Sequence, residues 1–385
     1  MSVYDESMKL HEELQGKIEV VSRKQVNTKE ELSLVYTPGV AAACKAIEKD
    51  EELSYTLTRR GHMVAVITDG SAVLGLGNIG PCAGMPVMEG KCALFKEFGD
   101  VDAFPLCIDS TNVDEIVQAI ALISKSFGGI NLEDIAAPRC FEIEKRLKET
   151  LDIPVFHDDQ HGTAIVVAAA LLNACKVSNK SFEHATIVIN GCGAAGCAIA
   201  TLLLKMGIHD LILCDKDGIL DPETQQLNPA QLALAQQTNK NNRKGLLKDA
   251  LVDADGFIGV SRANLVTPQM VATMNDGIVF AMANPSPEIL PEDALKGGAK
   301  VVGTGRSDYP NQINNVLVFP GIFKGALQAR AKEITDEMQI ASAYAIASMI
   351  SDEELTPTNI LPSALNKEVA DVVAAQVVKA WEATQ

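Results

Sequence analysis

Aromatic residues are scarce in this sequence: they make up 4% of 385 residues, with a single tryptophan. Small apolar residues are abundant instead, and this mixture suits parallel sheets packed closely between helices. Blocks rich in lysine and arginine are absent as well, and the formal net charge is −17. Because nucleic-acid binding needs a basic surface that displaces counterions from phosphate, the composition argues against a nucleic-acid partner.

Long apolar runs and paired cysteines are also missing. The longest apolar stretch, 164–172, is far shorter than the ~20 residues of a membrane-spanning helix, and the N-terminus has no apolar signal core. Nine cysteines, an odd number, are scattered without a CxxC pair. That pattern is typical of buried thiols in a reducing compartment. We therefore expect a cytoplasmic protein that does not bind a membrane.

The length, with 47% hydrophobic and 22% charged residues, predicts a folded protein of two domains. Apolar runs alternate with helical patterns, which predicts an α/β fold: an N-terminal parallel-sheet α/β domain over 1–160, a second α/β domain over 161–350, and a C-terminal helical tail over 351–385. The tail contains a helical apolar pattern at 365–381. The expected strands are 63–68, 103–108, 130–135, 153–156, 185–189, 211–214, 256–260, 278–282 and 301–302.

The pattern GxGxxG occurs twice, at 75–80 and at 191–196. The first match is followed by PCAGMP, whose prolines and glycines predict no helix and hence no pyrophosphate site, although this loop could cradle a substrate. The second match lies between an apolar strand and a helix of small residues. Gly191, Gly193, Ala194, Ala195 and Gly196 are therefore predicted to bind a dinucleotide, and the second domain is predicted to be a doubly wound, Rossmann-type NAD(P)-binding domain.

The choice of dinucleotide depends on the residues after the next strand. Asp215 ends that strand and can accept hydrogen bonds from the adenosine ribose, which favours NAD because the extra phosphate of NADP would be repelled. Lys216 lies beside it and softens that preference. NAD is the predicted cofactor, and NADP stays open.

Two acidic pairs follow neighbouring strand candidates: Glu133-Asp134, and Asp158-Asp159. Carboxylates gathered at the end of a buried sheet repel one another unless a cation compensates, and such oxygen ligands suit Mg²⁺ or Mn²⁺. The alternative is that each pair is a solvated turn or a helix cap. His157 and His161 lack a third zinc ligand, so hydrogen bonding that orients the acidic cluster is the favoured role for them.

Two further residues have ordinary structural interpretations on composition alone. Tyr36 precedes Thr37-Pro38-Gly39, which places it on an extended or turn segment. Lys91 lies in EGKCALFKEF, at the start of an expected helix, where a lysine is usually a surface charge.

Several long motifs together carry a resemblance to a known family. They are YTPGVAAAC (36–44), TDGSAVLGLGNIGPCAGMPVMEGK (68–91), NLEDIAAPRCFEIE (131–144), VFHDDQHGTAI (155–165), ANPSPE (283–288) and GRSDYPNQINNVLVFPGIFKGAL (305–327). In this order they resemble the compact, bacterial-type malic enzymes over nearly the whole chain. The resemblance implies oxidative decarboxylation of L-malate to pyruvate and carbon dioxide, with reduction of NAD(P) and a divalent metal.

Carried over by position, the resemblance implies a role for each motif residue. The implied roles are general acid for Tyr36, general base for Lys91, metal ligands for Glu133, Asp134 and Asp159, support for Asp158, and contacts with the nicotinamide end and substrate for Asn284 and Asn315. It also implies a homodimer in which one subunit completes the other's site. As a base, Lys91 would need a depressed pKa.

The sequence departs from the long-form enzymes in its first glycine loop. Those enzymes carry an arginine there for the substrate carboxylate, and this chain has Ser71-Ala72. Backbone amides, Ser71 or Asn78 are the candidates to replace it. The principal alternative function is a soluble oxaloacetate decarboxylase on the same scaffold. A ligand-sensing relative and an amino-acid dehydrogenase are weaker alternatives, because the acidic and basic residues are all present and an amino-acid dehydrogenase does not need paired carboxylates.

Overall fold

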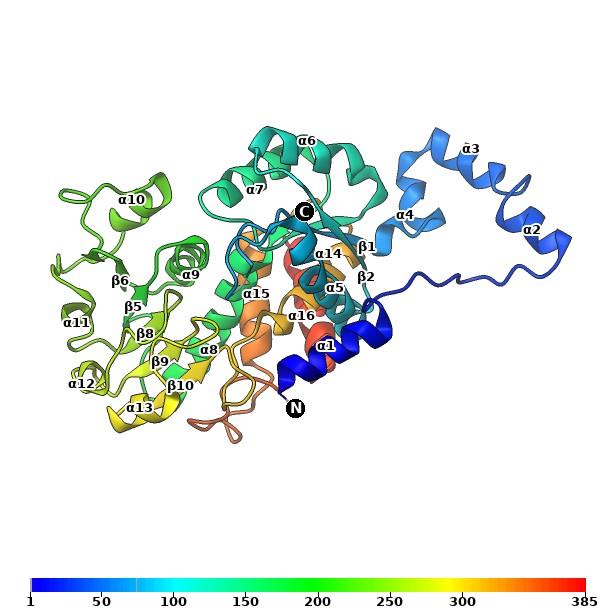
Figure 1. Cartoon of the computed structure of the whole chain (residues 1–385). Coiled ribbons are helices and arrows are strands. Elements are labelled where there is room, and N and C mark those ends of the chain that lie inside the picture. The colour runs from blue at the N-terminus through cyan, green and yellow to red at the C-terminus, as the bar shows by residue number, and fades with distance from the viewer. Residues whose placement is uncertain (1, 74) are drawn as a thin grey trace.

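Two sheets, one parallel and one mostly parallel, lie side by side in the computed structural model, which describes residues 2–73 and 75–385 (Figure 1). The long helix α8 (Thr163–Val177) runs between them, and 11 of its 15 residues are buried. The largest apolar cluster contains Val64 of the first sheet, Ala168 of α8 and Ile187 of the second sheet. One continuous core therefore joins the two halves of the chain.

The first sheet has the order β2-β1-β3-β4, and all its neighbouring strands are parallel. Its strands are β1 (Met63–Thr68), β2 (Asp102–Cys107), β3 (Gly129–Leu132) and β4 (Val155–His157). Each lies within two or three residues of its expected position. Because β3 ends at Leu132 rather than at Ile135, Glu133 and Asp134 lie in the loop after it.

Helices cover both faces of this sheet. On one face Ala65 and Ile67 pack with α6 (Val113–Ile123) and α7 (Arg139–Thr150). On the other, Val64 and Val66 face α5 (Gly80–Gly99) and α14 (Phe319–Gln328), and the last helix, α16 (Glu368–Glu382), packs against α14 and α5. C-terminal helices thus belong to the layer over the first sheet, although the second sheet lies between them in sequence.

The second sheet has the order β10-β9-β8-β5-β6-β7. Its strands are β5 (Thr186–Asn190), β6 (Asp210–Asp215), β7 (Gly218–Ile219), β8 (Gly256–Gly259), β9 (Ile278–Ala281) and β10 (Val301–Thr304). All neighbours are parallel except the short β6–β7 pair. The strand order reverses between β5 and β8, and ligands of doubly wound folds bind at such a point. The helix α9 (Ala194–Lys205) follows β5 directly.

A helix begins where the sequence predicted none. α5 starts at Gly80, the last glycine of the first GxGxxG pattern, so the expectation that PCAGMP prevents a helix is wrong. Pro81 lies in the first turn, where the missing N–H costs nothing, and Pro86 removes a single internal hydrogen bond. Burial of Met88 and Phe95 on α5 offsets that loss. Lys91 consequently lies in the middle of a helix and not at its start.

Residues 2–50 form an arm outside both sheets. Its helices are α1 (Val3–Leu14), α2 (Lys29–Val35) and α3 (Ala41–Lys49), and none of their residues is buried. In Figure 1, α2 and α3 lie far from the sheets at the end of an extended segment. We call residues 2–50 the N-terminal arm.

The remaining helices are short, apart from α15. They are α4 (Ser54–Leu57), α10 (Pro229–Ala235), α11 (Leu247–Ala250), α12 (Pro268–Val271), α13 (Pro291–Lys296), α15 (Asp336–Ala347), the 3₁₀ turns η1 (Glu51–Leu53), η2 (Arg60–His62), η3 (Ser124–Ser126) and η5 (Asn315–Leu317), and the π-helical turn η4 (Asp158–Gly162). Among the described residues no helix is long and apolar enough to cross a membrane.

Candidate active site

The two acidic pairs meet at the carboxyl ends of β3 and β4. Glu133, Asp134 and Asp159 each offer a carboxylate oxygen within 4.8 Å of the others. Backbone hydrogen bonds hold this arrangement: Glu133 N donates to Ile67 O at 2.8 Å, and Asp134 N donates to Asp159 Oδ2 at 2.7 Å. The pairs are therefore neither solvated turns nor independent caps. Among the described residues this is the one group of three His, Cys, Asp or Glu side chains that could share a metal ion.

Lys91 lies directly beside this acidic group. Its side chain is 7% exposed, and Nζ donates to Asp158 Oδ2 at 2.5 Å and lies 3.0 Å from Glu133 Oε1. Asp158 is fully buried and also accepts from Asn315 Nδ2 at 2.5 Å. Asp158 thus holds the lysine and the asparagine together.

The charges in this cluster do not balance. Burial raises the pKa of Asp158 to about 7, and burial also raises the pKa of Glu133 and of Asp159. For Lys91, burial lowers the pKa, but the carboxylates of Asp158 and Glu133 outweigh it and the net shift is upward. The expectation of a depressed Lys91 pKa is therefore wrong for the protein without a cation, because two negative partners stabilise the ammonium ion.

The donor set fits a hard divalent cation. Four carboxyl groups face one ammonium group, which leaves a buried excess of negative charge. Moreover, Asp158 Oδ1 is buried without a hydrogen-bond partner. Oxygen ligands with this charge suit Mg²⁺ or Mn²⁺, and a cation would remove the repulsion that burial creates.

Mn²⁺ affinity is expected to fall as the pH is lowered from about 8 to about 6. The raised carboxyl pKa values mean that protons compete with the cation in this range.

The stability of the metal-free protein is expected to change with pH in the opposite direction to the Mn²⁺ affinity. Glu133, Asp158 and Asp159 bind more protons in the native state than in the unfolded state between about pH 4 and pH 7, so their contribution to the free energy of unfolding falls as the pH rises through that window. His157, whose pKa is lowered to about 4, offsets part of this trend. Calorimetric Mn²⁺ titrations and thermal unfolding at several pH values check both; a pH-independent Mn²⁺ affinity contradicts the first.

His157 ends β4, and His161 lies within η4. His161 Nε2 lies 2.7 Å from Glu144 Oε1, and Lys148 Nζ lies 2.8 Å from the same oxygen. His157 Nδ1 is 3.6 Å from Asp159 Oδ2, and burial lowers the pKa of His157 to about 4. The expected orienting role therefore holds for His161 only indirectly, through Glu144. His157 makes no short hydrogen bond to the cluster.

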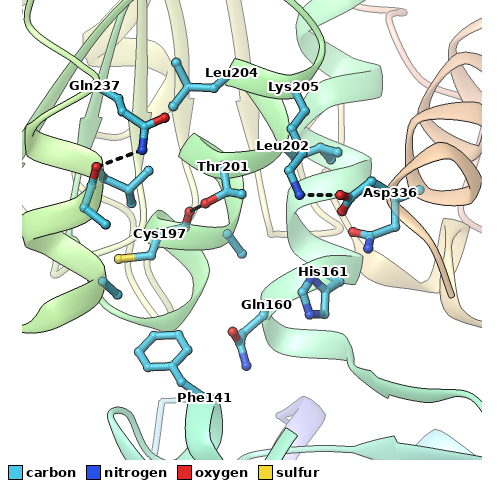
Figure 2. Close-up of a pocket in the computed structure, with 15 residues that line it drawn as sticks. Phe141, Gln160, His161, Cys197, Thr201, Leu202, Leu204, Lys205, Gln237 and Asp336 are labelled. Atoms are coloured by element: carbon cyan, nitrogen blue, oxygen red, sulfur yellow. Dashed lines mark hydrogen bonds and ion pairs between the residues drawn. The ribbon is translucent and has the colours of Figure 1, made fainter. Parts of the chain in front are cut away.

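A cavity of about 440 Å³ lies between η4, α9, α10 and α15. Figure 2 shows Gln160 and His161 on one wall, with Thr201 of α9 on the opposite wall and Phe141 below. Gln160 and His161, which follow Asp159 in the chain, thus border the same space as α9, the helix after the second glycine pattern.

The second glycine pattern forms a turn that only glycine permits. Gly191 has φ +105°, and a Cβ there would lie 2.6 Å from Val260 O. A Cβ on Gly196 would lie 1.9 Å from Gly191 O, so the start of α9 packs tightly against the strand. At Gly193 a Cβ would meet nothing within 4 Å, which leaves open space at the N-terminus of α9. That space and the helix terminus fit a pyrophosphate group.

Asp215 ends β6 beside this turn, as expected. Gln231 Nε2 donates to Asp215 Oδ2 at 3.0 Å and to Cys192 O at 3.1 Å, which ties the carboxylate to the glycine turn. Asp215, Lys216 and Arg262 border a cavity of about 410 Å³. The site can accommodate an adenosine moiety beside the carboxylate.

The first glycine loop approaches the second sheet. A Cβ on Gly75 would lie 3.6 Å from Pro285 Cδ and 3.8 Å from Asn284 C. Asn284 is exposed, and its Nδ2 donates to Met282 O at 3.3 Å. The loop therefore lies on the side of the molecule where Asn284 follows β9, which suits a substrate held between the two sheets.

Two models of known domain families match this chain and show which family it belongs to. The malic enzyme N-terminal domain matches residues 15–148, and the malic enzyme NAD binding domain matches residues 160–382. The chain belongs to the malic enzyme family.

Relatives extend this similarity over the full chain. A bifunctional malic/malolactic enzyme of Bacillus subtilis is 54% identical, over 99% of this chain and 93% of the relative. An NAD-dependent malic enzyme of Geobacillus stearothermophilus is 54% identical, over 99% of this chain and 79% of the relative. Among solved structures, the NAD-dependent malic enzyme of Thermotoga maritima matches with a TM-score of 0.93 and 48% identity, over 97% of this chain and 98% of that one.

Tyr36 is not brought to the acidic cluster of this malic enzyme chain. It ends α2 on the N-terminal arm and is 68% exposed. Figure 1 places α2 well away from α5, the helix that carries Lys91. Within one chain, the two residues that the family resemblance assigns to acid and base therefore lie apart.

Ser71 and Asn78 differ as candidates for the substrate carboxylate. Ser71 Oγ donates to Asp69 Oδ1 at 2.5 Å and accepts from Ala136 N at 2.9 Å and from Arg139 Nη2 at 3.0 Å. These bonds use the full capacity of a hydroxyl group. Asn78 is exposed on the glycine loop, so its amide stays a candidate.

Sequence reasoning missed Asp69 and Arg139. Asp69 follows β1 at the same sheet edge as Glu133, and an acidic residue directly after a buried strand could have signalled it. Arg139 gave no such signal, because its partner lies 70 positions away in the chain.

Proposed function

We propose that this chain catalyses the oxidative decarboxylation of L-malate to pyruvate and carbon dioxide, with reduction of NAD(P). The observation that carries the proposal is the buried Lys91 amine, which lies between Asp158 and Glu133 and beside a group of three carboxylates. This arrangement provides a proton-transferring group next to a cation site. A second α/β unit with a glycine turn provides the dinucleotide site.

Glu133, Asp134 and Asp159 would hold the cation, and the donor set fits either Mg²⁺ or Mn²⁺. When bound, the cation lowers the pKa of the malate hydroxyl, polarises the ketone and offsets the negative field that keeps Lys91 protonated. These side chains fix the place where the malate hydroxyl and its neighbouring carboxylate bind. The second carboxylate, which leaves as carbon dioxide, would face the glycine loop and the amide of Asn78.

Lys91 would act as the general base. In its neutral form it takes the proton from the C2 hydroxyl of malate as hydride leaves C2. Asp158 accepts a hydrogen bond from Nζ at 2.5 Å, so it aims the amine and stabilises the ammonium ion that forms. Asn315 is tied to the same Asp158 oxygen and would contact the substrate from the other side.

Gly191, Gly193, Ala194, Ala195 and Gly196 would bind the pyrophosphate of the dinucleotide, whose nicotinamide would supply the hydride acceptor. Asp215 would accept hydrogen bonds from the adenosine ribose, which favours NAD. Lys216 and Arg262 border the same cavity and offset part of that preference, so NADP is a possible second cofactor. Asn284 would lie at the nicotinamide end.

Tyr36 would act as the general acid in a second subunit, which makes the enzyme a homodimer. Loss of carbon dioxide leaves an enolate, and the phenol protonates its C3 to give pyruvate. Of the 26 exposed large apolar side chains among the described residues, 14 lie in the first 40 positions. An arm with so much uncovered apolar surface needs a partner surface, and a second copy of this chain would bury it while bringing Tyr36 to the partner's Lys91.

The two regions that match the malic enzyme domain models suit different roles along the chain. We assign substrate and metal binding to residues 1–160, dinucleotide binding to 161–350, and a helical tail to 351–385. We also place the enzyme in the cytoplasm, because all nine cysteines are free thiols and six of them are buried.

Steady-state assays with L-malate, Mn²⁺ and each dinucleotide test the proposal. The expected result is metal-dependent formation of reduced dinucleotide and pyruvate in equal amounts, faster with NAD. Oxaloacetate supplied alone tests the decarboxylase alternative, and lactate analysis tests for a malolactic reaction. Rapid decarboxylation of oxaloacetate without any malate-dependent reduction of NAD or NADP would refute the proposed function.

A further inference from the structure

A closed triangle of hydrogen bonds lies behind the loop that carries Asp134. Asp69 follows β1, and its side chain is 1% exposed. Arg139 Nη2, at the start of α7, donates to Asp69 Oδ2 at 2.9 Å and to Ser71 Oγ at 3.0 Å. Ser71 Oγ donates to Asp69 Oδ1 at 2.5 Å and closes the triangle. These bonds join the end of β1 to the beginning of α7.

The triangle holds the loop after β3 at two points. Ala136 N donates to Ser71 Oγ at 2.9 Å, and Ala72 N donates to the carbonyl oxygen of Asp134 at 2.9 Å. Asp134, whose carbonyl oxygen is one of these points, adopts φ +55°. A residue with a side chain keeps this left-handed conformation only when its surroundings support it. The two bonds from the 71–72 segment supply that support.

The same segment also contacts the helix that carries Lys91. Ile79 N and Gly80 N both donate to Gly70 O at 3.1 Å, at the start of α5. A Cβ on Gly70 would lie 2.2 Å from Gly80 O, so this contact permits no side chain. The segment 69–72 therefore lies between the start of α5 and the loop of Asp134, with Arg139 anchoring it from α7.

We propose that Asp69, Ser71 and Arg139 are positioning residues for the divalent cation, an inference that rests on the proposed function. They fix the loop 134–136 so that Asp134 presents its carboxylate together with Glu133 and Asp159. Three neighbouring carboxylates repel one another, and a loop held by one strand end alone would let Asp134 turn outward. Hydrogen-bonded groups behind metal ligands have this orienting effect generally.

Arg139→Gln tests the proposal through Mn²⁺ binding to the full-length enzyme, measured by electron paramagnetic resonance of free Mn²⁺ without substrate. The expected result is a dissociation constant raised about tenfold or more, with the NAD dissociation constant unchanged. The matched control is Arg146→Gln on the same helix, whose guanidinium group makes surface ion pairs with Asp114 and Glu142. It should bind Mn²⁺ like the parent enzyme.

Ser71→Ala keeps the test decisive if Arg139→Gln does not fold. This variant removes the bond to Ala136 N but leaves the Asp69–Arg139 ion pair, and it should also weaken Mn²⁺ binding. Dissociation constants within twofold of the parent in folded variants would overturn the inference. Asp159→Asn separates the two proposals: if it abolishes Mn²⁺ binding while Arg139→Gln and Ser71→Ala bind Mn²⁺ within twofold of the parent enzyme, the metal site stands and the positioning role fails. If Asp159→Asn has no effect, the proposed metal site itself fails.

Discussion

Lys91→Ala is expected to lower the rate of malate oxidation by about 10³-fold or more, because it removes the proposed general base. NAD binding should not change, since the glycine turn at 191–196 lies on the other sheet. Formation of NADH at saturating malate and Mn²⁺ measures the first effect, and fluorescence titration with NADH measures the second. Turnover at the parental rate would remove Lys91 from the mechanism.

Lys96→Ala is the matched control for this variant. Lys96 lies on the same helix, but its side chain is 51% exposed and pairs with Asp100 and Asp102 at the surface. Its loss should leave turnover unchanged. Because Lys91 also neutralises buried carboxylates, Mn²⁺ binding to Lys91→Ala should be measured in the same samples. Retained Mn²⁺ binding shows that the lost rate comes from the missing amine and not from a collapsed cluster.

Tyr36→Phe is expected to slow turnover by about 10²-fold, because the enolate loses its proton donor. The stronger test combines two variants in one dimer. A heterodimer of a Tyr36→Phe subunit and a Lys91→Ala subunit, purified through two different affinity tags, contains one doubly defective site and one intact site if Tyr36 acts across the interface. Its activity should therefore return to about half that of the parent dimer.

The opposite arrangement gives a different result in the same experiment. If Tyr36 acted within its own chain, each subunit of the heterodimer would carry one defect, and activity would stay at the level of the two parent variants. A heterodimer no more active than the more active of the two homodimers would contradict the trans arrangement. Native mass measurements on the same sample show whether dimers form at all.

Much of the fold follows from local sequence pattern. The strand expected at 63–68 has those bounds. Its own residues decide this pattern, because an apolar run lies between polar turns. The glycine turn at 191–196 could also be predicted from the sequence, because strand, turn and helix are adjacent in the chain.

Elements that depend on distant contacts were harder to predict. Prolines and glycines near Pro81 argue against a helix locally, yet α5 forms because Phe95 packs against Phe319 with ring centroids 4.7 Å apart. That contact joins residues more than 200 positions apart, and so no local pattern reveals it. The packing of α16 against α5 also joins segments that are far apart in the sequence.

The candidate site also has some features that the local sequence predicts and others that depend on distant contacts. The sequence placed Glu133 and Asp158 at neighbouring strand ends, and parallel pairing of β3 with β4 brings them together. The sequence could not give the charge state of Lys91, because that depends on two carboxylates reaching its amine in space. Likewise, the family resemblance assigned Tyr36 a role, whereas only the structure shows that the arm carries it away from its own chain's site.

The most direct test of the account is a crystal structure of the enzyme with Mn²⁺, NADH and the malate analogue tartronate, with Mn²⁺ located by its anomalous scattering. The account predicts one Mn²⁺ ligated by Glu133, Asp134 and Asp159, with the Lys91 amine and a Tyr36 phenol from the other subunit both contacting the analogue. Mn²⁺ bound elsewhere, or an analogue with neither Lys91 nor any Tyr36 within hydrogen-bonding distance, would contradict it.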